Sequence, residues 1–195
     1  HLTESPIELF EKWFSEVDLK FPEIETNAMT LSTLGVDGYP KSRVVLLKHY
    51  SSDGFIFYSN YNSEKGVAIK NFPKVCLSFH WEQAERQVII KGDIQKTSAR
   101  ISDNYFNSRP RGSQLGALAS DQSNVISNRE ILKNKLKILE KKYKDTTIDR
   151  PNFWGGYVVA PIEIEFWQGR SNRLHDRIRY TKQINKSWLI ERLSP

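Results

Sequence analysis

The sequence has few of the residues from which cross-links and metal sites are built. It contains one cysteine, Cys76, and four histidines among 195 residues. A single cysteine excludes an internal disulfide and a cysteine metal cluster. Cys76 lies in an apolar run, so we expect a buried structural thiol. The histidines are scattered without an H-E-x-x-H pattern, and we predict no metal site.

Long hydrophobic runs are also missing. No apolar run approaches the ~18 residues that a membrane-spanning helix needs, and no signal peptide is visible. We therefore expect a cytoplasmic protein that binds no membrane. The chain begins at His1 rather than Met, and we expect part of the natural N-terminus to be missing.

Several motifs of nucleotide and acyl chemistry are absent too. The sequence has no G-x-G-x-x-G, no Walker loop and no G-x-S-x-G element. These absences argue against a dinucleotide-binding parallel sheet, a P-loop enzyme and a serine hydrolase of the common type.

The residues that are present indicate a folded domain with an affinity for anions. Apolar residues make up 38% of the chain, aromatic residues 12%, and the net charge is +6. The length matches one domain, which we expect to span residues 1–195. Nucleic acid, membranes and phosphorylated small molecules are all anions that such a charge attracts.

The periodicity predicts strands with peripheral helices. An amphipathic helix is expected at about 5–18, opened by a capping box from Ser5 to Glu8. Two Asp-Gly turns separate apolar runs and indicate hairpins. The expected strands are 28–34, 42–50, 55–59, 75–81, 87–94, 157–160, 162–167 and 187–193, and the expected helices are 63–72, 97–108 and one opened by a second capping box at 127–130.

This order predicts a mainly β fold, an antiparallel sheet or barrel with helices around it. The C-terminal β region is expected at about 154–195. Ile162, Ile164 and Phe166 alternate with polar residues there and predict a half-buried strand. The stretch 108–113 has the composition of a loop.

Three basic clusters are the candidates for chemistry. They are the strand Arg43 to Lys48, the segment Tyr105 to Ser113, and the segment Phe166 to Arg177. Arginine and serine hydroxyls together suit phosphate, which an arginine can bind with two hydrogen bonds. Each cluster alone is also consistent with ordinary surface charge. Together they fit a phosphorylated cofactor with a phosphorylated substrate, or a nucleic acid.

At the same residues the sequence resembles the pyridoxine 5'-phosphate oxidase family. The resemblance runs from about residue 6 to residue 195. Its motifs are Arg43 to Lys48, Phe57 to Asn60, Glu85 to Val88, Tyr105 to Gln114, Gln122-Ser123, Phe153 to Gly156, Ile164 to Gly169, Arg173 to Arg177 and Arg192 to Pro195.

The resemblance implies an FMN-binding antiparallel split β-barrel that forms a homodimer with FMN at the interface. It implies oxidation of pyridoxamine or pyridoxine 5'-phosphate to pyridoxal 5'-phosphate. A hydride passes from C4' to flavin N5, and O2 is reduced to H2O2. The remaining alternatives are a flavin reductase-type split barrel, a non-catalytic carrier of pyridoxal phosphate, and an RNA-binding module.

The resemblance also assigns roles to individual residues. Arg173 and His175 are implied as catalytic groups over the pyridine ring. The implied FMN contacts are Arg43, Val44, Leu46, Lys48, Tyr58, Ser59, Lys65, Gln87, Gln122, Ser123, Trp167 and Arg177. The implied substrate contacts are Lys48, Tyr105, Arg109, Ser113, Arg173, Leu174 and His175.

One residue departs from the family pattern, and the alternation of one strand complicates the implied site. The family usually has Ser-Arg-Lys where this chain has Ser63-Glu64-Lys65, so we expect Glu64 to repel the FMN phosphate unless another cation compensates. In addition, strand alternation places Arg43 and Lys48 on opposite faces. We expect them to converge only if Arg43 reaches around the strand end or a bulge intervenes.

Overall fold

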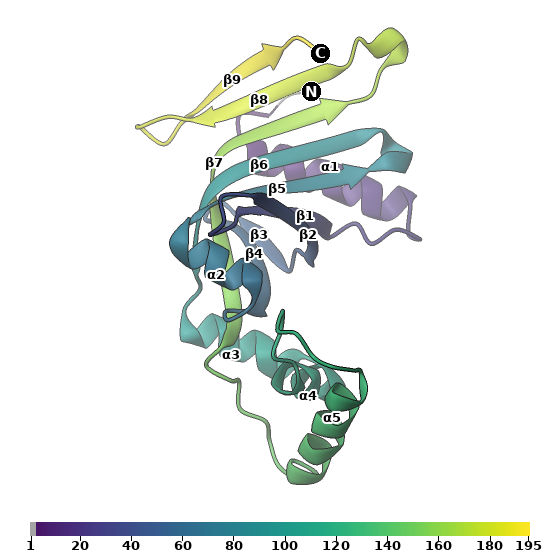
Figure 1. Ribbon diagram of the computed structural model, residues 1–195. Coiled ribbons are helices and arrows are strands. Elements are labelled where there is room, and N and C mark those ends of the chain that lie inside the picture. Colours follow the sequence, from purple (N-terminus) through teal and green to yellow (C-terminus); the bar gives the residue numbers. More distant parts are fainter. Residues whose placement is uncertain (1–2) are drawn as a thin grey trace.

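The computed structural model describes residues 3–195, so the first two residues of the expected 1–195 domain lie outside its described part. Within that range nine strands form one antiparallel sheet, which is curled and flanked by helices (Figure 1). The strands are β1 (Ala28–Leu34), β2 (Pro40–Leu46), β3 (His49–Ser51), β4 (Gly54–Asn60), β5 (Lys74–Trp81), β6 (Arg86–Lys96), β7 (Trp154–Gln168), β8 (Asp176–Lys182) and β9 (Trp188–Leu193).

The predicted mainly β, antiparallel fold with peripheral helices is therefore confirmed. None of the helices among residues 3–195 is both long and apolar enough to cross a bilayer. The helices are α1 (Pro6–Lys20), α2 (Glu64–Asn71), α3 (Ala99–Ser108), α4 (Arg111–Ala119) and α5 (Glu130–Lys142).

Strand β7 organises the sheet. The strand order is β2-β1-β5-β6-β7-β4-β3, with β8 also on β7 and β9 on β8. One edge of β7 pairs with β6 from Tyr157 to Gln168, while its other edge pairs first with β4 and then with β8. The two halves of β7 therefore belong to two different ends of the molecule (Figure 1).

A register shift separates these halves. The β6–β7 pairing slips between Lys91 and Gly92, so that Lys91 pairs with Glu163 and Gly92 with Pro161. Ile162 is the extra residue and is 45% exposed, whereas Ile164 and Phe166 are buried. The expected alternation is thus confirmed for Ile164 and Phe166 and wrong for Ile162, because the bulge interrupts the two-residue period.

Helix α1 covers the main core. Phe10 is fully buried and its ring meets Phe55 and Phe79 edge-on at centroid distances of 5.0 and 5.1 Å. A second, smaller core contains Phe106, Leu115, Ile148 and Trp154. It packs the three helices α3, α4 and α5 against the start of β7. Figure 1 shows these three helices at one end of the sheet. Cys76, expected to be buried, is only half-buried.

The helix caps were predicted with mixed success. Ser63 caps α2 as expected, since its side chain accepts a hydrogen bond from Gly66 N. Ser5 precedes α1 but makes no capping hydrogen bond. The box at 127–130 is also wrong: Asn128 Oδ1 accepts from Ile131 N and takes the role expected of the serine, so α5 begins only at Glu130.

The expected strand 42–50 is divided in two. Leu47 N donates to Asn27 O, and Lys48 N donates to Ile56 O, each at 2.8 Å. The backbone thus changes partner from β1 to β4 at these residues, and β2 ends before β3 begins. A continuous apolar run in the sequence gives no sign of this change of partner.

The stretch 108–113 is less loop-like than its composition suggested. Only Arg109 and Pro110 separate α3 from α4, and Ser113 N and Gln114 N both donate to Pro110 O. Proline favours the first turn of a helix because it has no N–H to leave unpaired.

Strand β8 is absent from the sequence prediction, which treats its residues only as part of a basic cluster.

Candidate functional site

Most of the candidate residues from the first two thirds of the chain line one cavity. Its volume is about 470 Å³, within the range of small-molecule sites. Strands β2 and β4, helices α2 to α4 and the start of β7 contribute to it. The lining residues are Val44, Val45, Leu46, Lys48, Tyr58, Ser59, Lys65, Tyr105, Arg109, Pro110, Ser113, Gln122 and Trp154.

A stack of aromatic rings forms one wall of this cavity. Tyr58 and Tyr105 stack at a centroid distance of 3.8 Å, and Trp154 lies parallel to Tyr58 at 5.7 Å. The Arg109 guanidinium lies 4.6 Å from the centroid of the Trp154 ring, a cation–π contact. The wall thus combines flat apolar surface with a positive charge.

The charges of the cavity are all of one sign. Lys48, Lys65 and Arg109 are among its lining residues, and no carboxylate is. Arg109 Nη1 is buried without a hydrogen-bond partner among the residues that the structure describes. Burial lowers the pKa of Arg109, and burial together with Arg43 lowers the pKa of Lys65. A bound anion would offset the cost of burying the charged Arg109 and Lys65 side chains, because a nearby negative charge favours their protonated forms.

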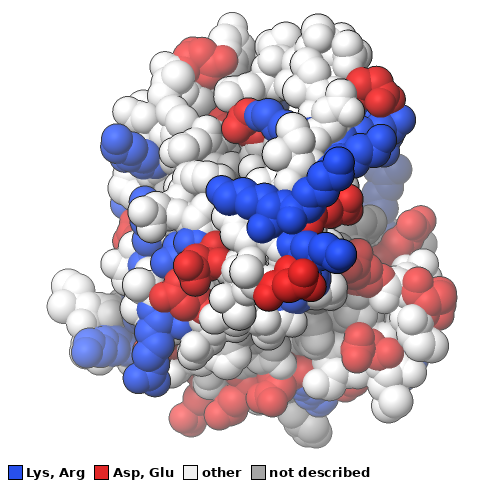
Figure 2. All heavy atoms as spheres, turned by 90° about the horizontal axis from the view of Figure 1, so that it is seen from below, with Lys and Arg blue, Asp and Glu red and all other residues white. Residues whose placement is uncertain are grey.

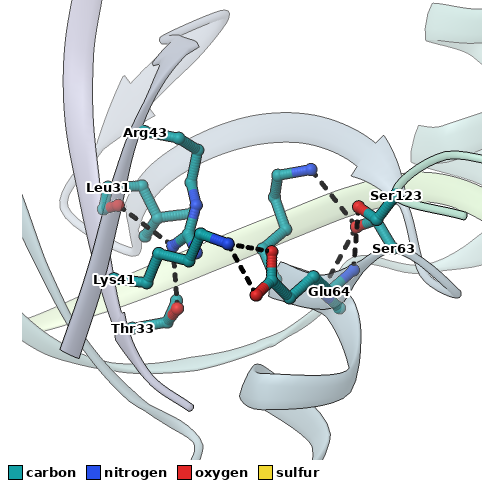
Figure 3. A network of polar contacts seen from close by, with 9 residues as sticks. Leu31, Thr33, Lys41, Arg43, Ser63, Glu64 and Ser123 are labelled. Carbon is teal, nitrogen blue, oxygen red and sulfur yellow. Dashed lines mark hydrogen bonds and ion pairs between the residues drawn. The ribbon is translucent and has the colours of Figure 1, made fainter. Parts of the chain in front are cut away.

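The far end of the cavity is held by the loop before α5. Gln122 Oε1 accepts from Lys65 Nζ at 3.1 Å and from Ser59 Oγ at 3.5 Å. Ser123 does not line the cavity; its Oγ accepts from Glu64 N at 3.1 Å (Figure 3). The expected pair Gln122 and Ser123 therefore fixes the start of α2 as well as the cavity.

Arg43 does not line the cavity, although Lys48 does. Arg43 Nη1 donates to Thr33 Oγ1 at 2.7 Å and to Leu31 O at 3.2 Å on the neighbouring strand β1 (Figure 3). Lys48 lies beyond the end of β2, where the backbone has changed partner. Neither expected route to convergence is observed: the two cations lie at different places along the site.

The remaining candidates form a second group on the C-terminal strands. Gln87 pairs with Trp167, and Trp167 pairs with Arg177, so the three residues form a row across β6, β7 and β8. Arg177 Nε contacts Glu165 Oε1 at 2.8 Å, and its Nη1 donates to Ser194 O. The hydrogen bond to Glu165 raises the pKa of Arg177.

His175 and Arg173 lie in the turn beside this row. The His175 and Trp167 rings are 4.7 Å apart, and His175 Nδ1 accepts from Arg170 N at 3.2 Å. Arg173 is exposed and has a φ of 61°, and Leu174 is 70% exposed. A positive φ in a non-glycine residue is strained and is often found at functional sites.

The sequence prediction missed one residue of the stacked aromatic wall, Trp154. It belongs to the quoted motif Phe153 to Gly156, but that motif was given no role. The two glycines after it are the available signal. A Cβ on Gly156 would lie 2.5 Å from Thr97 Oγ1 and 2.9 Å from Tyr58 Cε1, so the backbone approaches the stacked rings as only glycine allows.

Many basic residues lie outside both groups. Seen from the α4–α5 end, a band of basic side chains has acidic side chains beside it (Figure 2). Two lysines of α5, Lys133 and Lys135, pair with Glu130 and Asp121. Paired and interspersed charges are typical of a solvated surface rather than of a face that binds nucleic acid.

Two family models match most of the chain. Residues 19–142 match the family described as pyridoxamine 5'-phosphate oxidase. Residues 154–195 match the family described as the pyridoxine 5'-phosphate oxidase C-terminal dimerisation region. The second match includes Trp167 and Arg177 of the row across β6, β7 and β8, but not Gln87.

Curated relatives match over nearly the full chain. A pyridoxine/pyridoxamine 5'-phosphate oxidase of Flavobacterium johnsoniae is 62% identical over 194 residues, which are 100% of this chain and 91% of the relative. The enzyme of the same name from Acaryochloris marina is 51% identical, covering 98% of this chain and 86% of the relative.

Solved structures show the same fold. PhzG from Burkholderia lata, in complex with tetrahydrophenazine-1-carboxylic acid, superposes with a TM-score of 0.92 at 28% identity, covering 99% of this chain and 94% of that one. A pyridoxamine 5'-phosphate oxidase-related, FMN-binding protein of Nostoc punctiforme has a TM-score of 0.78 at 12% identity, with both chains fully covered. The curled sheet is thus the split barrel of this group.

Proposed function

Because the chain belongs to the pyridoxamine 5'-phosphate oxidase family, we propose that it converts pyridoxamine or pyridoxine 5'-phosphate to pyridoxal 5'-phosphate, with FMN as cofactor and O2 as acceptor. Membership of that family makes the chain an enzyme. The substrate, the cofactor, the acceptor and the residue roles are the proposed part. We also propose one domain over residues 1–195 and a cytoplasmic location.

The observation that carries the proposal is the cation-rich, carboxylate-free cavity with its stacked aromatic wall. The cavity offers flat apolar surface to a ring system and unpaired positive charge to a phosphate. Arg109 Nη1 is buried and has no hydrogen-bond partner among the described residues. Because buried donors are normally paired, this atom is available to donate to an acceptor on a bound ligand. Both FMN and a pyridoxine phosphate combine a ring with a phosphate.

The two phosphates can be assigned to different ends of the cavity. Lys65, Ser59 and Gln122 are linked by hydrogen bonds at the start of α2, and we assign the FMN phosphate to this end. Arg109, with Lys48, Tyr105 and Ser113, would hold the substrate phosphate. Anchoring the phosphate uses binding energy remote from the reacting carbon to orient C4'.

Bound FMN would supply the redox chemistry, accepting a hydride from substrate C4' and passing the electrons to O2. The protein's part is binding and orientation. Val44 and Leu46 would lie along the cofactor. Arg173 would cover the pyridine ring, and His175 would hydrogen-bond to the substrate or move a proton at C4' substituents. Trp167, Gln87 and Arg177 would contact the flavin from the C-terminal group.

A homodimer is required to bring these two groups to one cofactor. The matched dimerisation region, residues 154–195, contains both Trp154 and Trp167. We propose that the cavity of one subunit and the C-terminal group of its partner together enclose FMN at the subunit interface. Each dimer then has two equivalent sites, as a two-fold axis demands.

The decisive experiment is spectroscopic. Purified protein loaded with FMN should bleach near 450 nm when pyridoxamine 5'-phosphate is added without oxygen, and air should restore the flavin bands with formation of H2O2. The imine left by hydride loss from the amine would be hydrolysed by water to pyridoxal 5'-phosphate and ammonia. Pyridoxamine without its phosphate is the control and should react far more slowly. Bound flavin that the phosphorylated substrate does not bleach would favour a flavin reductase or a carrier of pyridoxal phosphate.

A protein that binds no flavin but binds RNA, with affinity that falls steeply as salt rises, would instead support the nucleic-acid alternative. The interspersed surface charge argues against that result (Figure 2).

A further inference from the structure

A carboxylate lies among the cations at the start of α2. Both carboxylate oxygens of Glu64 accept from Lys41 Nζ, at 2.7 and 2.6 Å (Figure 3). Glu64 is the first residue of α2, and its own N–H donates to Ser123 Oγ. The next residue, Lys65, lines the cavity. Glu64 is therefore adjacent in the chain to the lysine assigned to the FMN phosphate.

Three cations surround this one carboxylate. Lys41 is its direct partner, while Arg43 and Lys65 interact with it through space, since Glu64 raises the pKa of both against the larger effect of their burial. The start of α2 adds further positive potential, because a helix N-terminus carries unpaired N–H groups. In the absence of phosphate, Glu64 is the anion that balances this field.

The pair is accessible rather than built into the core. The Lys41 and Glu64 side chains are 59% and 55% exposed. An exposed ion pair contributes little to stability, so separating it costs little. A phosphate dianion bound at Lys65 would repel Glu64 and attract Lys41. Breaking the Lys41–Glu64 ion pair to allow this would cost little free energy.

We propose that Glu64 is an internal counter-anion of the phosphate site, which holds Lys41 in the empty protein and releases it to the phosphate when the cofactor binds. The proposal rests on the proposed function, because the phosphate in question is that of FMN. Glu64 then weakens cofactor binding while it stabilises the protein without cofactor. Lys41 becomes a third cation of the loaded site.

The test compares E64Q, K41Q and the double variant with the unchanged protein. FMN affinity is measured by quenching of flavin fluorescence, and riboflavin, which lacks the phosphate, serves as the matched control ligand. E64Q should bind FMN about tenfold more tightly at low salt, because a negative charge beside the phosphate dianion is removed. Riboflavin affinity should be unchanged.

The other variants complete the cycle. K41Q should bind FMN more weakly, because it loses the released cation and leaves Glu64 unmasked. The E64Q change should raise FMN affinity by a smaller factor in the K41Q background than in the unchanged protein, because no ion pair is then left to break, and this difference measures the coupling between the two residues. Each difference should shrink at high salt, since both side chains are exposed.

Thermal unfolding provides the second readout. E64Q should melt at a slightly lower temperature than the unchanged protein without ligand, because three cations lose their counter-anion, and this deficit should close or reverse with saturating FMN. An E64Q variant with unchanged FMN affinity and equally lowered melting temperatures in both states would overturn the proposal, since Glu64 would then only support the helix start.

The proposed function can fail separately. If no variant binds FMN, protection against heat by inorganic phosphate still reports on the site. Stronger phosphate protection of E64Q than of the unchanged protein would uphold the counter-anion role and reject FMN. Equal protection of both proteins by phosphate would reject the counter-anion role itself.

Discussion

Trp154 and Trp167 lie at the two ends of a single strand, β7, and belong to the two different groups of site residues. Thirteen residue steps of about 3.3 Å separate them by about 43 Å along the strand. Trp154 forms the cavity wall with Tyr58, and Trp167 lies in the row with Gln87 and Arg177. The two groups therefore lie at opposite ends of one strand.

This separation predicts complementation between defective subunits. We expect R109A, in the cavity, and R173A, in the C-terminal group, each to be nearly inactive as a homodimer. Coexpression with two affinity tags yields heterodimers in which one of the two sites combines two intact halves. The purified heterodimer should recover about half of the normal activity per dimer, given two independent sites.

The matched control combines two defects within the cavity. A heterodimer of R109A and K48A has no intact cavity and should stay inactive. Recovery in this control, or its absence in the first pair, would contradict a site shared between subunits. The measurement is pyridoxal 5'-phosphate formation by heterodimers isolated through both tags.

Replacement of Arg173 tests the ring contact. R173A should lower kcat/KM for pyridoxamine 5'-phosphate at least tenfold, which corresponds to about 1.4 kcal/mol of lost transition-state stabilisation. The Arg173 side chain is exposed, so its truncation should leave folding unaffected. Steady-state kinetics with FMN saturation confirmed by absorbance give the answer. Near-normal turnover with full flavin occupancy would refute the role of Arg173.

Local patterns in the sequence predicted most of the fold. The Asp-Gly turns at Gly38 and Gly54 have φ angles of 83° and 136°, and they connect β1 to β2 and β3 to β4 as expected. The Ser63 cap is likewise local. Such features are readable because the residue and the structure it demands lie within a few positions.

Two of the failures arose where partners distant in the sequence decide the structure. Ile162 is exposed because the β6–β7 pairing shifts its register at Gly92. The expected strand breaks near Lys48 because Leu47 N donates to Asn27 O whereas Lys48 N donates to Ile56 O. Periodicity cannot reveal either event. The site residues were named through the family resemblance, but only the fold shows that they form two separate groups and that Lys41 pairs with Glu64.

Gly156 offers a test of the packing behind the cavity wall. G156A places a methyl group against Thr97 Oγ1 and the Tyr58 ring, and overpacking of this kind costs about 1–3 kcal/mol. We expect a lower free energy of unfolding in urea and weaker FMN binding through the displaced Tyr58. G112A is the control: no atom lies within 4 Å of its Cβ, and alanine within α4 should stabilise the helix. Equal stabilities for both variants would contradict the close approach at Gly156.

Lys65 makes FMN binding dependent on pH in the alkaline range. Burial, and then the nearby Arg43, hold the pKa of Lys65 below its ordinary value in the protein without ligand. A bound phosphate dianion favours the charged amine and raises this pKa again. Affinity is therefore fully present below the lowered pKa. It is lost as pH rises from that pKa towards the higher pKa of the complex.

Linkage gives the opposite slope for the stability of the protein without ligand. The unfolded chain, with a lysine pKa of about 10.4, binds more protons than the folded protein between the two pKa values. The free energy of unfolding should then rise with pH in that window. FMN titrations and urea unfolding from pH 7.5 to 10 measure both slopes. K65M should bind FMN more weakly at pH 7.5. It should also lose the Lys65 contribution to the pH dependence of FMN affinity and of the free energy of unfolding. If K65M keeps both pH dependences of the unchanged protein, another group is responsible for them.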